Sequence, residues 1–122
     1  MTEIADDAVD LVHCLGFIYL RHGQPFRAVV MLIVAAQEQP NRPEILRTLC
    51  AALIAARLGQ QALGVLDKLD MLVPEDTQHP MMRLMRARAL LLLGRTEEAR
   101  TVFRPPTPAD PPRPPKPRMR AA

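Results

Sequence analysis

Small and apolar residues recur along this chain at a spacing of 34 residues. A shift of 34 positions brings residues of one stretch onto the same residue types further along, in the pairs Ala28 and Ala62, Leu32 and Leu66, Pro40 and Pro74. A shift of 71 positions, which is twice 34 plus 3, reaches a third copy through the pairs Gly23 and Gly94, Ala28 and Ala99, Leu32 and Phe103. The three extra residues fit a longer loop before Met81. An internal repeat of this length indicates one structural unit used several times.

Glycine and proline residues divide each copy into two apolar helical segments. Gly23 breaks the first copy, Pro25 suits the first turn of the next helix, and Pro40 follows its end. Asn41 and Glu44 have the spacing of a capping box for the third helix. The six predicted helices cover about residues 7–21, 25–39, 41–57, 59–72, 81–93 and 97–104. The pattern therefore predicts an all-α fold of three helix-turn-helix hairpins, against the alternative of an ordinary helical bundle with accidental spacing.

The composition also favours helices over sheets. Hydrophobic residues make up 48% of the 122 positions, but there are only three Phe, one Tyr and no Trp. A core rich in alanine, leucine and methionine is typical of helical proteins. The length suffices for one domain, which we expect at residues 1–104, with repeats at about 9–42, 43–76 and 80–104.

The last part of the chain, residues 105–122, has a different character. It holds eight of the 13 prolines and carries four basic residues against one acidic residue, which accounts for the whole net charge of +3. Such a segment cannot form a packed core. We expect a disordered, Pro-rich basic tail. Nucleic-acid binding through four basic residues without interleaved aromatic residues would be weak, so no nucleic-acid partner is predicted.

Residues suited to catalysis or metal binding do not cluster in the sequence. His13, His22 and His79 are isolated, and there is no glycine-rich phosphate loop, no His pair at metal spacing and no nucleophile elbow. Cys14 and Cys50 lie in apolar helical runs, and we expect both to be buried free thiols. We therefore predict no enzyme activity, no cofactor and no metal.

The chain gives no sequence signal for export or membrane insertion. It begins with the acidic stretch MTEIADDAVD, which lacks the basic and apolar regions of a secretory signal. No apolar stretch reaches 18 residues without a charge. We expect a soluble, cytoplasmic protein that does not enter the membrane.

A 34-residue helix-turn-helix unit of this kind resembles the tetratricopeptide repeat. In the first unit the residues that carry the resemblance are Val12, Leu15, Gly16, Tyr19, Ala28, Ala35 and Pro40. Gly16 and Ala28 are small where two helices are expected to cross closely, and Tyr19 and Leu32 fill the space around them. In the third unit Ala87, Leu90, Ala99 and Phe103 fit, but Arg83 and Arg86 fall where apolar residues are expected. The resemblance covers about residues 9–104 and implies a short right-handed solenoid.

The resemblance also implies a binding groove, because the first helices of such repeats line a concave face. The residues assigned to this groove are His13, Phe17, Leu20, Arg47, Ile54, Leu84, Arg88 and Leu91. Related proteins that clamp an acidic chaperone tail carry Lys, Arg and Asn at set inner positions, which here hold His13, Phe17, Thr48, Met81 and Met85. An apolar trough suits an amphipathic helix or an extended apolar peptide instead. The chain's own sixth helix or a second copy remains an alternative occupant.

Among compact three-repeat proteins, the chain is similar to the small tetratricopeptide chaperones of bacterial type III secretion. The similarity rests on LGFIYLRHGQPFRAVVMLIVAAQEQP and ALLLLGRTEEARTVF. It is nearest in layout to the Y-type chaperones of an early export substrate, with the needle-subunit chaperones next.

This family implies a cytoplasmic holder linked to virulence that uses no ATP. It would bind a small secreted substrate as a heterodimer or heterotrimer and deliver it to the export apparatus, with an export-gate component as a further partner. The alternative function is a generic scaffold or adaptor that self-associates or bridges protein partners.

Overall fold

The computed structural model describes residues 2–104, which form six α-helices and one short 3-10 helix and contain no strand. The elements are α1 (Thr2–Arg21), α2 (Pro25–Glu38), α3 (Pro43–Ala55), α4 (Gly59–Leu72), η1 (Pro74–Asp76), α5 (Pro80–Leu92) and α6 (Thr96–Phe103). The predicted all-α fold is confirmed for these residues. The predicted Pro-rich tail lies outside them.

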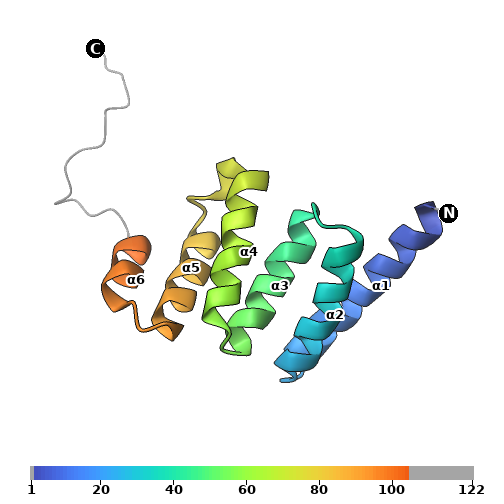
Figure 1. Ribbon diagram of the computed structural model, residues 1–122, viewed down its shortest axis with the longest axis horizontal. Coiled ribbons are helices and arrows are strands. Elements are labelled where there is room, and N and C mark those ends of the chain that lie inside the picture. The colour runs from blue at the N-terminus through green and yellow to red at the C-terminus, as the bar shows by residue number, and fades with distance from the viewer. Residues whose placement is uncertain (1, 105–122) are drawn as a thin grey trace, which may run out of the picture.

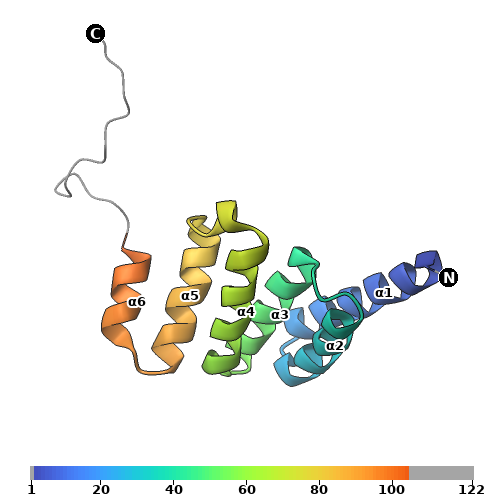
Figure 2. The ribbon, with the colours of Figure 1, turned by 45° about the horizontal axis from the view of Figure 1, so that its top comes forward.

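The helices stand side by side in chain order, from α1 at one end of the molecule to α6 at the other (Figures 1 and 2). Each helix packs on the next, and in addition α1 contacts α3 and α3 contacts α5. We call α1–α2, α3–α4 and α5–α6 hairpins 1, 2 and 3. Because their first helices touch one another in series, these helices form one continuous side of the molecule, which we call the first-helix face.

The same turn joins the two helices of every hairpin. Gly23, Arg57 and Gly94 each adopt a left-handed conformation after α1, α3 and α5, with φ of 75°, 66° and 76°. The next residue donates its backbone N–H to the carbonyl five residues earlier, in the pairs Gln24–Tyr19 at 2.9 Å, Leu58–Leu53 at 2.8 Å and Arg95–Leu90 at 3.0 Å. These are Schellman-type helix ends. The 34-residue period of the sequence, lengthened by three before hairpin 3, thus reappears as a period of the backbone.

The two helices of hairpin 1 approach closely where the sequence places small residues. A Cβ atom added to Gly16 would lie 2.7 Å from Cγ of Leu32, and both Ala28 and Leu32 are fully buried. The matching residues Ala62 and Leu66 are also fully buried in hairpin 2. These side chains belong to one core cluster that runs through all three hairpins.

Several details differ from the sequence predictions. Helix α1 begins at Thr2, more than one turn before the predicted start. Arg42 occupies the N-cap position of α3 without a side-chain capping hydrogen bond, and Pro43 lies in the first turn. Asn41 therefore lies outside α3, and the predicted capping box does not form. Cys14 is exposed rather than buried, although both cysteines are free as expected. Burial raises the pKa of the Cys50 thiol to about 12, so this thiol stays protonated.

Arg83 and Arg86, which depart from the repeat pattern, have different surroundings. Arg86 contacts the acidic side of α4, and Arg83 lines a polar hollow. Arg86 donates to Asp70 at 2.7 Å and to Asp67 at 3.2 Å, and both carboxylates lie on α4. Arg83 lines a hollow of about 370 Å³ beside α6, and its Nε atom is buried without a hydrogen-bond partner among residues 2–104. The charged Arg86 thus joins hairpin 2 to hairpin 3 where other repeats use apolar contacts.

Candidate protein-binding surface

A hollow of about 360 Å³ opens on the first-helix face between α1 and α3. It is lined by His13, Cys14, Phe17, Ile18 and Thr48. Four of these side chains come from consecutive turns of α1, and only Thr48 comes from α3. Phe17 and Ile18 are half exposed, which leaves apolar surface open to solvent. The hollow brings together two of the predicted groove residues, His13 and Phe17.

A short hydrogen-bond chain fixes the polar margin of this hollow. The Thr48 hydroxyl donates to the backbone carbonyl of Glu44 at 3.0 Å. Its oxygen lies 2.8 Å from Nε2 of His13 and therefore accepts the Nε2–H of the imidazole. Burial, followed by the positive charge of Arg42, lowers the pKa of His13 below its ordinary value. The imidazole is thus neutral at pH 7, and the hollow presents no charge of its own.

This lowered pKa predicts a pH dependence of stability. The unfolded chain binds a proton to His13 near pH 6.5, whereas the folded chain binds it only at lower pH, so stability falls as the pH drops through 6.5. His13→Gln keeps a hydrogen-bond donor but cannot titrate. Urea unfolding at about pH 7.5 and about pH 5.5 should show a larger loss for the wild type than for this variant. Equal losses would contradict the assigned state of His13.

Charged residues gather at one end of the face, where α1, α2 and α3 meet. Arg42 donates to Asp10 at 2.8 Å, to Gln39 at 2.9 Å and to Glu44 at 3.2 Å, and Gln39 also donates to Asp6. The hydrogen bond to Asp10 is the main reason that the pKa of Arg42 is raised. The group holds one cation, Arg42, and three carboxylates, so it has a net negative charge and offers little to an acidic partner.

The remaining predicted groove residues are not all available at the surface. Leu20 and Leu84 are partly buried, and Leu91 and Arg88 are exposed. Arg47 forms an ion pair with Asp76 at 3.6 Å. Ile54 is only 5% exposed and belongs to the core, which corrects its assignment to the open groove.

The position of Ile54 in the array explains this difference. Leu20, Ile54 and Leu91 occupy one position of the repeat, but Ile54 lies in the middle hairpin, which has a packed neighbour on each side. Leu91 lies in hairpin 3, beyond which the described residues add no further hairpin, and it is 54% exposed. The same position is thus core in one repeat and surface in another.

Leu11 and Ile18 extend the apolar surface around α1, and neither was predicted from the sequence to be a surface residue. At the 34-residue period they correspond to Ile45 and Ala52, which are fully buried in hairpin 2. Ile45 is covered by Val9 and Ala35 of hairpin 1. Leu11 is 61% and Ile18 50% exposed, because no described residue covers this edge of hairpin 1.

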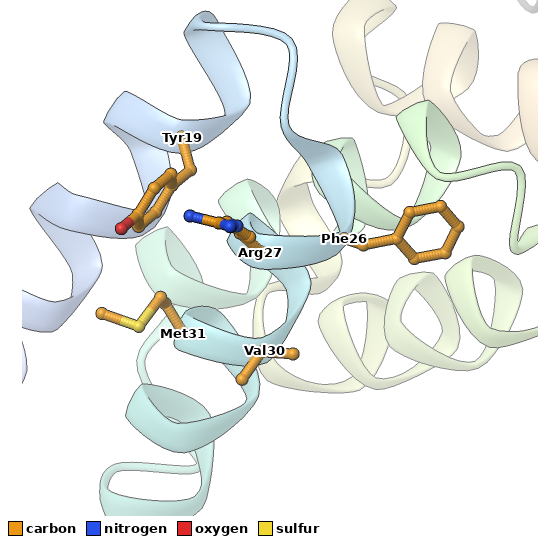
Figure 3. Close-up of a pocket in the computed structure, with 5 residues that line it drawn as sticks. All are labelled: Tyr19, Phe26, Arg27, Val30 and Met31. Atoms are coloured by element: carbon orange, nitrogen blue, oxygen red, sulfur yellow. The ribbon is translucent and has the colours of Figure 1, made fainter.

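A second apolar surface lies on α2, on the side away from the core. Its exposed side chains are Phe26, Val30, Ile33 and Val34, which we call the α2 outer face. A hollow of about 340 Å³ adjoins it, lined by Tyr19, Phe26, Arg27, Val30 and Met31. Figure 3 shows Arg27 and Met31 on the side of Tyr19, whereas Phe26 points away from it.

Within residues 2–104 no cluster of His, Cys, Asp or Glu side chains could hold a metal ion. No helix in this part of the chain combines the length and the apolar character needed to cross a membrane. Comparisons of the chain with protein-family models, with curated proteins and with solved structures found no match.

Proposed function

We propose that this protein is a tetratricopeptide-like chaperone that holds an apolar helix or an extended apolar segment of another protein on its first-helix face. The observation that carries the proposal is the open hollow between α1 and α3. Around it, hairpins 1 to 3 repeat one turn at the period of the sequence, which supports a short solenoid of equivalent units.

The chemistry of the hollow favours an apolar occupant over a charged one. Phe17 and Ile18 supply exposed apolar surface, and the neutral His13 is already bonded to Thr48. Arg21, whose guanidinium lies 5.6 Å from the centre of the Phe17 ring, is a cation beside the hollow that could meet a polar end of the ligand. Apolar helices bind in grooves of this kind through side chains spaced three and four residues apart.

The type III secretion assignment rests on the resemblance of two sequence stretches and on the size of the array. On this proposal the ligand is a small export substrate or needle-type component, held in the bacterial cytoplasm before delivery to the export apparatus. A ligand that is partly disordered when free must become ordered on binding, so a broad apolar surface is needed for useful affinity. The apolar edge formed by Leu11 and Ile18 adds such area next to the hollow.

The experiment is co-expression with each small protein encoded by the genes next to that of this chain, followed by affinity purification. Phe17→Glu places a charge in the hollow and should reduce the retained partner by at least about tenfold, the effect expected of a central aromatic contact. Met71→Glu is the matched control, because Met71 is 83% exposed on α4 and lies outside the hollow. Retention of the partner by Phe17→Glu, with unchanged helical circular dichroism, would contradict the proposed site.

The scaffold alternative makes a different prediction for the protein expressed alone. A self-associating scaffold that uses the first-helix face should lose its self-association in the Phe17→Glu variant. A chaperone should instead be rescued from poor solubility by its co-expressed substrate, and this rescue should fail with Phe17→Glu.

A further inference from the structure

The α2 outer face is not required by the fold. Helices α4 and α6 serve as the comparison, because they occupy the same position in hairpins 2 and 3 that α2 occupies in hairpin 1. A shift of 34 residues from Phe26, Val30, Ile33 and Val34 reaches Gln60, Gly64, Asp67 and Lys68. A shift of 71 residues from the first three reaches Glu97, Thr101 and Arg104. All these residues are exposed, and none of them carries a large apolar side chain.

The four apolar side chains form one stripe along the helix. They follow the i, i+4, i+7, i+8 spacing of a helix face that packs on another helix. Buried residues of α2, among them Ala28 and Leu32, lie on the opposite side against α1 and α3. Phe26 is 64% and Val30 61% exposed. A contiguous apolar stripe of this kind on a surface helix marks an interaction site.

The charges beside the stripe indicate what covers it. Arg27 and Glu38 are the only charged residues of α2, one near each end of the helix. They are eleven residues apart, close to three helical turns, and so they lie on the same flank of the stripe. Both are exposed, and neither forms an ion pair with another residue in the range 2–104.

We propose that the protein forms a homodimer in which α2 of one copy packs antiparallel against α2 of the other. A two-fold axis crossing the stripe near Ile33 places Arg27 of each copy beside Glu38 of its partner copy. It also places Val30 of each copy opposite Val34 of the other copy, so that the two α2 outer faces bury each other. An isologous contact of this form is the commonest geometry of homodimers. The proposal concerns the side of hairpin 1 away from the core and is independent of the function proposed for the first-helix face.

The first test uses the residues that α4 carries at the same positions. The triple variant F26Q/I33D/V34K places on α2 the side chains that α4 carries at the equivalent positions. Because α4 carries them in hairpin 2, these side chains are compatible with the fold. Sedimentation velocity of the wild type over a range of concentrations should give a monomer–dimer equilibrium. The triple variant should weaken dimerisation by at least about a hundredfold, since it removes three buried apolar side chains. Its thermal unfolding, measured at equal monomer fraction, should match that of the wild type.

The second test addresses the antiparallel arrangement. Arg27→Glu and Glu38→Arg each create two like-charge contacts in the dimer and should weaken it by about tenfold. The double variant R27E/E38R restores opposite charges across the two-fold axis and should recover most of the wild-type affinity. Recovery of affinity is specific to this pairing. Nonspecific apolar association does not depend on whether the positive charge lies near the start or the end of α2.

Three outcomes would overturn the proposal. The first is a wild-type protein that stays monomeric at every concentration. The second is a dimer that persists in F26Q/I33D/V34K or fails to respond to the charge variants. The third is a monomer whose co-expressed partner is lost in the triple variant, which would assign the stripe to a different protein. Because Phe17 is not changed, the result is independent of substrate binding at the first-helix face.

Discussion

Replacing Leu66 with alanine is expected to lower the free energy of unfolding by about 2 to 5 kcal/mol. Leu66 is fully buried in α4, in the middle hairpin, and belongs to the core cluster that runs through all three hairpins. Truncation removes three heavy atoms and leaves a cavity that neighbours on both sides keep from collapsing. The loss should be measured by urea denaturation followed by helical circular dichroism.

The matched control for this substitution is Phe103→Ala. Phe103 occupies the same position of the repeat in α6, but its side chain is 49% exposed. Removing it should cost less than about 2 kcal/mol, because solvent already covers half of the ring. A loss as large as that of Leu66→Ala would mean that Phe103 is packed in solution. The pair therefore tests whether the position within the array, and not the residue type, decides the energetic effect.

Gly16→Ala is expected to lower the free energy of unfolding by about 1 to 3 kcal/mol, although alanine is the better helix former. The added Cβ would lie 2.7 Å from Cγ and 2.9 Å from one terminal carbon of Leu32. Leu32 is fully buried, so its side chain would have to shift within the packed core to make room for the added Cβ. Gly64→Ala is the matched control, since among residues 2–104 no atom beyond its chain neighbours and the adjacent backbone of α4 lies within 4 Å of the added Cβ. That change should raise stability by about 0.5 to 1 kcal/mol.

The same contact predicts a non-additive double variant. Leu32→Ala alone should be destabilising because it leaves a cavity, but it also creates room for a Cβ at residue 16. The loss in G16A/L32A should therefore be smaller than the sum of the single losses by about 1 to 2 kcal/mol. Additive losses in urea denaturation would show that the helix crossing relaxes in another way.

The sequence predicted the helices and their turns well because the signals for them are local. A left-handed residue after each first helix suits glycine, and Gly23 and Gly94 mark two of the three turns. Arg57 adopts the same conformation without being glycine, and only the period links it to the other two. Pro40 and Pro74 likewise each follow the end of a helix, two residues after Glu38 and Leu72.

The sequence predicted burial less well, because burial depends on what the next hairpin covers. Ile54 was assigned to the groove by analogy, yet a hairpin packs on each side of it and it is buried. Cys14 was expected to be buried because its neighbours are apolar, yet it lines the open hollow. Helical periodicity identifies an apolar face but does not tell whether another helix covers it.

The α2 outer face could have been found in the sequence by comparing the repeats with one another. A single unit offers no reason to separate Phe26 or Ile33 from the core residues nearby. Aligned at the 34-residue period, they stand opposite Gln60 and Asp67, and the contrast becomes visible. A difference between repeats is therefore where an interaction surface can be sought, because the pattern that the repeats share is already explained by the fold.

Contacts in this molecule run almost entirely between neighbouring helices, and this has a consequence for where the chain opens. In such a linear array the outer units are held from one side only, so local unfolding starts there while the middle unit stays intact longest. Hairpin 1 is one of these outer units, and it carries both the hollow of the first-helix face and the α2 outer face. A molecule bound to either surface would raise the opening free energy of this hairpin by mass action. A protein with both surfaces empty would therefore open more readily at hairpin 1, and this end of the molecule would be more accessible to proteolysis.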